Sequence, residues 1–413
     1  MSAVTAPLRR KGYRALLIGQ GVSALGDWMA TFTFMALALR ETGSPAAVGG
    51  ILALRLLPAL LGGPLAARVA ARWDRRRTMV AMDLARAGTI AVVPLVHGLW
   101  WLYVTAFVVE VCSLVALPAR DASIPDLVEP DSLPVANGLM LGSSFGTIPF
   151  GAAAFALVAA LPSPVRPFAT AFWADALTYL VSAALIAPLT QLSRGGRGVA
   201  DHEESEHLRL RDALAIPLVR AILPATAAVA LGLGALFSLG IVLVRDVLGA
   251  GDAEFGALVA CFGVGAILGL GALQRLGARR QLEATKAGAA LLGIIVAVFS
   301  LSPSVVFAFF GAVAFGAAAA WTLASGMGVL QSSLEGDARV VAFAAFHTVI
   351  RGGLAIAAIA AGVAGQLVGR VDWPVVGRLE PSRLVLLCSG VVVLVSALRV
   401  PADAIDARLE QVA

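Results

Sequence analysis

The segment that decides the fold is residues 66–77, which read Ala66-Ala67-Arg68-Val69-Ala70-Ala71-Arg72-Trp73-Asp74-Arg75-Arg76-Arg77. It is a short basic turn between two long apolar stretches. Arginines are costly to place in hydrocarbon, whereas the flanking stretches are too apolar to face water. The turn therefore predicts a membrane surface with a spanning helix on either side of it.

The composition extends this conclusion to the whole chain. Hydrophobic residues make up 59% of the sequence and charged residues 14%, whereas a soluble domain has about 25% charged residues. Lipid must therefore surround much of the chain. The net charge of +5 is spread over short loops, so it predicts no nucleic-acid partner.

A spanning helix needs about 20 mostly apolar residues. Twelve such stretches follow one another along the chain, at 13–39, 46–70, 77–97, 99–119, 136–160, 166–190, 218–243, 252–274, 284–302, 304–330, 340–367 and 383–400. They predict an all-α membrane protein with twelve transmembrane helices.

Arginine and lysine are concentrated in cytoplasmic loops of membrane proteins. The N-terminus, 68–77, 191–217 and 275–286 are basic, and they alternate with loops at 41–45, 97–99, 161–165 and 302–304 that carry almost no such charge. We therefore expect a multi-pass protein of the inner (plasma) membrane with both termini in the cytoplasm. Segment 368–382 is predicted to be a loop on the outside.

The longest polar stretch, 191–217, separates two sets of six spans. It predicts a cytoplasmic linker between an N-terminal six-helix bundle, 1–190, and a C-terminal one, 218–413. The basic turn at 66–77 has a weak counterpart at 271–280, as expected for two bundles related as parallel repeats.

Several short motifs occur in a specific order. They are Gly26-Asp27-Trp28 in span one, Arg72 to Arg76 in the basic turn, Asp83 and Arg86 in span three, Arg120, Pro125, Ala136 and Asn137 around the next loop, and Asp175 to Ala183 in span six. In this order they resemble the major facilitator superfamily, and within it the branch of the enterobactin exporter and macrolide-efflux-type proteins. The resemblance implies two pseudo-symmetric six-helix bundles that work by alternating access.

One residue departs from the family pattern. The family's loop aspartate falls on Ala71, and the resemblance implies that this aspartate ties the two halves together on the cytoplasmic side. We expect Asp74 or Asp83 to replace it in that contact.

Charged side chains at membrane depth are candidates for function because burying them is costly. Asp27 and Glu110 lie near the centres of spans one and four, which the family resemblance places at the central cavity. A carboxyl group there can bind and release a proton, and a structural hydrogen bond or ion pair is the alternative. Arg55 in span two is expected to be the partner of one of these acids, or else an anion contact.

The other candidates divide into two groups. Trp28 and Trp321 are candidate substrate contacts, with helix packing as the alternative, and Asp175 is interpreted as a packing residue. The resemblance and the position beside the cytoplasmic loops imply a gating network of seven residues: Arg72, Asp74, Arg75, Arg76, Asp83, Arg86 and Arg120.

The sequence contains no Gly-x-x-x-x-Gly-Lys loop for ATP, no metal-ligand spacing and no soluble catalytic domain, so we expect no enzyme and no cofactor. The resemblance predicts a monomeric secondary transporter that exports a drug-like or siderophore-like small molecule in exchange for protons. A lipid or lysolipid transporter of the same fold is the first alternative. A non-transporting membrane sensor or a membrane-embedded enzyme is the second.

Overall fold

The structure is a computed structural model that describes residues 5–61, 73–161, 168–193, 214–273, 278–334, 336–369, 371–373 and 377–398. Within these ranges, 11 helices are long and apolar enough to cross a membrane. The predicted second span, 46–70, is represented by α2 (Pro45–Leu61), and the rest of that span lies outside the described residues. The expectation of a helical membrane protein is confirmed.

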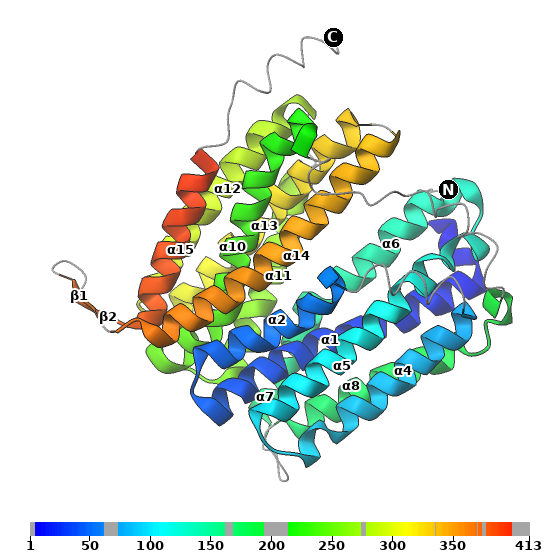
Figure 1. Ribbon diagram of the computed structural model, residues 1–413, viewed down its shortest axis with the longest axis horizontal. Coiled ribbons are helices and arrows are strands. Elements are labelled where there is room, and N and C mark those ends of the chain that lie inside the picture. Colours follow the sequence, from blue (N-terminus) through cyan, green and yellow to red (C-terminus); the bar gives the residue numbers. More distant parts are fainter. Residues whose placement is uncertain are drawn as a thin grey trace. The chain divides into compact units, whose positions relative to one another are not determined.

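The helices divide into two compact units. The first contains α1 (Lys11–Thr42), α2 from Leu54 onward, α4 (Arg75–Val92), α5 (Leu99–Asp121), α6 (Leu133–Phe145), α7 (Ile148–Ala160) and α8 (Ala169–Ile186). Here α1 packs against α8, α7 and α6, and α4 packs against α8 and α5 (Figure 1). Phe34 of α1 meets Phe172 of α8 edge-on, with ring centroids 5.0 Å apart. The first helix is thus the centre of this unit.

The boundary between α1 and α2 is set by local sequence. Gly43 caps α1 with φ 62°, the left-handed conformation that glycine adopts without steric cost. Its amide donates to the carbonyl of Leu39, and Pro45 then begins α2 at a position where the missing amide hydrogen costs nothing. A sharp reversal between the first two spans follows.

The predicted fifth span, 136–160, corresponds to one candidate membrane span, Val135–Ala160, but its helix is interrupted. Residues 136–160 form two helices, α6 and α7, which are separated at Gly146 and Thr147. Pro149 lies in the first turn of α7, where it has no amide hydrogen to donate to the preceding turn. The proline therefore accounts for a break inside an otherwise apolar stretch.

The second unit contains Ser44–Ala53, which is the start of α2, and the helices of the C-terminal part of the chain. These are α10 (Pro217–Val242), α11 (Asp252–Leu273), α12 (Ala278–Ser300), α13 (Val305–Ser333), α14 (Gly336–Leu367) and α15 (Pro381–Leu398). A π-helical turn, Leu243–Val247, extends α10. The sequence-based boundaries did not assign the start of α2 to the C-terminal part.

Small residues bring the helices of the second unit close together. A methyl group added to Gly265 or Gly269 of α11 would meet the backbone of α13 at Val313 or Ala317. The two glycines are four residues apart and so lie on one face of α11. Such contacts are typical of membrane helices, where small residues permit close approach of backbones.

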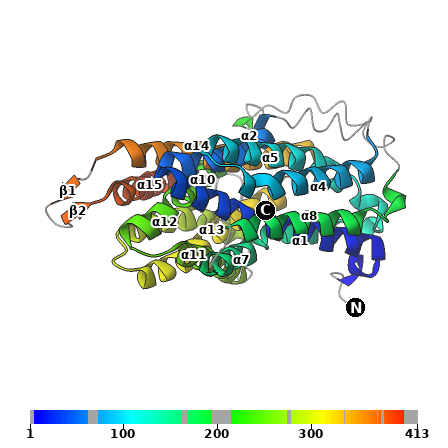
Figure 2. The same cartoon turned by 90° about the horizontal axis from the view of Figure 1, so that it is seen from below.

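A short hairpin follows α14. Its strands β1 (Val371–Trp373) and β2 (Gly377–Leu379) are antiparallel, with Val371 opposite Leu379. Figure 2 shows the hairpin beyond the adjoining ends of α14 and α15. The sequence predicted a loop over 368–382, so this hairpin is a small addition to an otherwise helical fold.

Candidate functional site

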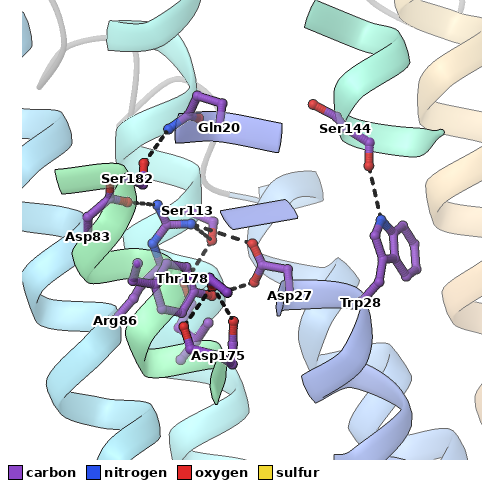
Figure 3. A network of polar contacts seen from close by, with 12 residues as sticks. Gln20, Asp27, Trp28, Asp83, Arg86, Ser113, Ser144, Asp175, Thr178 and Ser182 are labelled. Atoms are coloured by element: carbon purple, nitrogen blue, oxygen red, sulfur yellow. Dashed lines mark hydrogen bonds and ion pairs between the residues drawn. The ribbon is translucent and has the colours of Figure 1, made fainter. Parts of the chain in front are cut away.

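Asp27 lies midway along α1 and is the centre of a polar cluster inside the first unit (Figure 3). Arg55 of α2 reaches it with an Nη2–Oδ1 distance of 3.3 Å, as the sequence predicted for one of the intramembrane acids. Arg86 of α4 lies 3.7 Å from Oδ2, and Tyr179 of α8 donates its hydroxyl to Oδ1. The Asp27 side chain is 24% exposed, whereas those of Arg55 and Arg86 are 9% and 6% exposed. The carboxylate thus links α1 to α2, α4 and α8, and its side chain remains partly exposed.

Arg86 holds the second acid of the cluster. It forms an ion pair with Asp83, three residues earlier in α4, and donates to Oγ of Ser113 in α5 at 3.2 Å. Its guanidinium carbon lies 4.4 Å from the centre of the Tyr179 ring, within the range of a cation–π contact. The sequence grouped Asp83 and Arg86 with the arginines of the basic turn in a gating network, and that role stays a prediction. The structure places Arg86 beside Asp27.

Asp175 of α8 is the third acid. Its side chain is fully buried, and Thr178 donates its hydroxyl to Oδ1 at 3.1 Å. Among the described residues, Oδ2 of Asp175 has no hydrogen-bond partner. Asp27, Arg55 and Arg86 all act on it electrostatically. The sequence favoured packing for this residue, but the structure places it in the charged cluster.

Tyr179 was not predicted as a site residue, although the sequence carries a signal that would have found it. Four polar residues of α8 follow the spacing i, i+3, i+4 and i+7, namely Asp175, Thr178, Tyr179 and Ser182. This spacing places them on one face of a helix. A polar stripe on a membrane helix predicts a face turned toward the protein interior.

Glu110 lies in α5, and its side chain is half-buried. It acts electrostatically on Arg55. Both acids that the sequence selected near the centres of spans one and four thus act on the same arginine, Arg55.

Glycine at position 26 allows α8 to approach Asp27. A methyl group there would overlap Oδ1 of Asp175 and Oγ1 of Thr178. Gly19, two turns earlier on the same face of α1, lies against Ser182. The absence of a side chain at Gly26 therefore lets α8 pack closely against α1, and this close packing allows Tyr179 of α8 to contact Asp27.

We expect Gly26→Ala to lower the stability of the protein by about 1–3 kcal/mol, the usual cost of overpacking a well-packed core. The added methyl group must displace two short polar side chains, the buried Asp175 and the half-buried Thr178. Gly21→Ala is the matched control in the same helix, because its methyl group would lie 3.6 Å from Ser143, an ordinary contact distance. Thermal unfolding of both variants in detergent checks the prediction, and equal melting temperatures would contradict it.

Trp28 points away from Asp27 in Figure 3 and donates its indole hydrogen to the carbonyl of Ser144 at 3.0 Å. Arg120 contacts the hydroxyl of the same serine at 3.3 Å. Both residues thus hold the end of α6 beside the break in span five. In the second unit, Trp321 donates to the carbonyl of Ala284 at 3.0 Å. Each indole has a packing contact, and the role of either tryptophan in substrate binding stays a prediction.

The described residues of the basic turn connect helix ends within the first unit. Asp74 caps α4 by accepting the amide of Arg77 at 2.7 Å. Arg75 donates to the carbonyl of Ala122 and to Asp126, both at 2.7 Å, and Arg76 donates to the carbonyl of Ala187 at 2.8 Å. These contacts link the start of α4 to the residues that follow α5 and α8.

The prediction about the missing loop aspartate stays a prediction. Ala71 and Arg72 lie outside the described residues. Asp74 is engaged as a helix cap and Asp83 as the partner of Arg86, both inside the first unit.

Comparison with known proteins decides the family. Residues 16–358 match the model of the Major Facilitator Superfamily. The chain belongs to the major facilitator superfamily. The family expected from the motifs is thereby confirmed, and the protein is a multi-pass membrane transporter rather than an enzyme.

One curated relative of this superfamily member is an uncharacterized MFS-type transporter, YfiS, from Bacillus subtilis (strain 168). The two sequences are 32% identical over 119 residues. The matched region covers 29% of this chain and 28% of the relative.

Solved superfamily structures share the fold at low sequence identity. A bacterial homolog of the human lysosomal transporter Spinster, inward-facing and occupied, aligns with a TM-score of 0.71 and 16% identity over 95% of this chain and 96% of that one. The nucleoside transporter NupG aligns with a TM-score of 0.63 and 14% identity over 99% and 100%. At this identity the likeness supports the fold alone.

Proposed function

We propose that this protein is a secondary active transporter driven by protons, and that the cluster around Asp27 is where the proton binds. The observation that carries the proposal is the excess of acids over bases in a buried cluster. Among the described residues, Asp27, Asp83 and Asp175 are gathered around two guanidinium groups, those of Arg55 and Arg86. A buried charge without a partner is unfavourable, so such a cluster is stabilised when it takes up a proton.

The position of Asp27 suits it to exchange that proton. It is the most exposed of the three acids, and it contacts both arginines. Protonation of Asp27 would remove the charge that holds Arg55 of α2 to α1. A proton could thereby change the contacts between two helices, which is what coupling to alternating access requires.

The sequence motifs support a proposal for the direction of transport and for the class of substrate. Gly26-Asp27-Trp28 and Arg72 to Arg76 resemble exporters of siderophores and macrolides. We propose export of a drug-like or siderophore-like molecule. We also propose a monomer in the plasma membrane with both termini in the cytoplasm, an orientation supported by the basic turn and linker.

The test is transport by the purified protein in liposomes with an acidic lumen. Ethidium, erythromycin, uridine and lysophosphatidylcholine serve as probes for a cationic drug, a macrolide, a nucleoside and a lysolipid. We expect ethidium or erythromycin to accumulate while protons leave the lumen. Accumulation driven only by a sodium gradient would reject proton coupling. Proton-driven movement of uridine or lysolipid alone would reject the substrate class and leave proton coupling intact.

A further inference from the structure

We propose that Asp175 is the residue that stores the coupling proton, as a neutral carboxylic acid, while Asp27 remains ionised between the two arginines. This inference rests on the proposed proton coupling and assigns its proton-binding residue. It differs from the sequence-based interpretation, which favoured Asp27 and Glu110 for the proton and packing for Asp175.

The surroundings of Asp175 favour the neutral form. Its side chain is fully buried, and within the described part of the chain Oδ2 accepts no hydrogen bond. Asp83 is also buried and its Oδ2 likewise accepts no hydrogen bond among the described residues, but its Oδ1 forms an ion pair with the guanidinium of Arg86. A buried carboxylate needs such a partner to remain charged. Asp175 has no ion pair at contact distance among the described residues.

The charges around Asp175 are largely compensated by one another. From α1, Asp27 is paired with Arg55 of α2 and lies near Arg86. From α4, Asp83 is paired with Arg86. Glu110 of α5 acts on Arg55, and Tyr179, on the same face of α8, donates to Asp27. The two positive charges are thus engaged by other acids.

The contact with Thr178 also fits a protonated Asp175. The threonine hydroxyl has one hydrogen, and it lies closer to the backbone oxygen of Asp175, at 2.7 Å, than to Oδ1, at 3.1 Å. When the hydroxyl donates to the backbone, a protonated Oδ1 can donate to the threonine oxygen instead. Such a contact is satisfied in the neutral form of the acid.

The proton step then conserves charge. The O–H bond of Asp175 breaks, and an O–H bond forms on a carboxylate oxygen of Asp27. Asp27 becomes neutral and loses its attraction for Arg55, which is then left to act electrostatically on the new carboxylate of Asp175. Asp27, with its partly exposed side chain, then releases the proton to water on one side of the membrane. The starting state is restored when Asp27 takes up a proton from water on the other side and passes it to the carboxylate of Asp175. One proton moves in each cycle.

Infrared difference spectroscopy of the purified full-length protein, reconstituted in liposomes, tests the protonation state. We expect the carbonyl band of a protonated carboxylic acid in the wild type at neutral pH. The band should disappear in Asp175→Asn and persist in Asp131→Asn, a control at an exposed position. Thr178→Val has nearly the same shape but no hydroxyl, so it should shift the band without removing it. This variant keeps the assignment testable if Asp175→Asn does not fold.

A wild-type spectrum without the band would overturn the proposal, as would a band that survives in Asp175→Asn. Loss of the band in Asp83→Asn, with no change in Asp175→Asn, would assign the proton to Asp83 and also overturn it. In transport, Asn imitates the neutral acid, so Asp175→Asn should exchange ethidium for ethidium but lose accumulation driven by a pH gradient. If the wild type itself ignores the gradient, the proposed coupling fails, while the infrared band still reports on Asp175.

Discussion

Replacing Arg86 by glutamine is expected to destabilise the protein by about 3–5 kcal/mol, the cost of breaking a buried ion pair by removing one partner. Arg86 is 6% exposed and is the ion-pair partner of Asp83, which is 1% exposed. It also lies near Asp27 and covers the ring of Tyr179. Without the guanidinium, the buried carboxylate of Asp83 and the partly exposed carboxylate of Asp27 lose their shared positive charge. The first unit would then be weakened where α1, α4 and α8 meet.

Thermal unfolding and the yield of monodisperse protein in detergent measure this effect. Arg77→Gln is the control, because its side chain is exposed on the first turn of α4. The double variant Asp83→Asn with Arg86→Gln should recover much of the loss, since it leaves no uncompensated carboxylate at position 83. A double variant as unstable as Arg86→Gln alone would show that Arg86 acts through shape or through the tyrosine, not through the ion pair.

Much of the architecture could be predicted because a lipid environment constrains sequence strongly. Long apolar stretches must cross the membrane, and the arginines of residues 66–77 must lie outside its hydrocarbon core. The order of motifs around Asp27 and residues 72–76 then indicated the family. The break in span five was less visible, because Pro149 and Gly146 are both common in uninterrupted membrane helices.

The site could be predicted only in part, because composition does not reveal how far each helix is rotated. Asp27 and Arg55 stood out as isolated charges in apolar spans, and Arg55 was expected to pair with one of the acids, Asp27 or Glu110; the structure pairs it with Asp27. Asp175 also lies in an apolar span, but nothing in its own stretch shows that α8 faces Asp27. That orientation depends on close approach at Gly26 and Gly19, a property of two helices together.

The same geometry predicts that Asp27→Asn abolishes proton-driven transport while the protein still folds. Asparagine keeps an oxygen that accepts the hydroxyl of Tyr179, and position 27 is partly exposed, so the loss of stability should be smaller than for Arg86→Gln. No group at position 27 could then exchange a proton with water. Accumulation of ethidium in liposomes with an acidic lumen should fall to the level of protein-free liposomes.

Glu110→Gln separates the role of Asp27 from a general need for negative charge near Arg55. Glu110 acts on Arg55, whereas Asp27 lies within ion-pair distance of both Arg55 and Arg86, so Glu110→Gln should reduce accumulation less than Asp27→Asn does. Asp131→Asn, at an exposed position, should transport like the wild type. If Asp27→Asn and Glu110→Gln both retain full accumulation under a pH gradient, neither acid couples the proton. The cluster would then serve only to join α1, α2, α4 and α8.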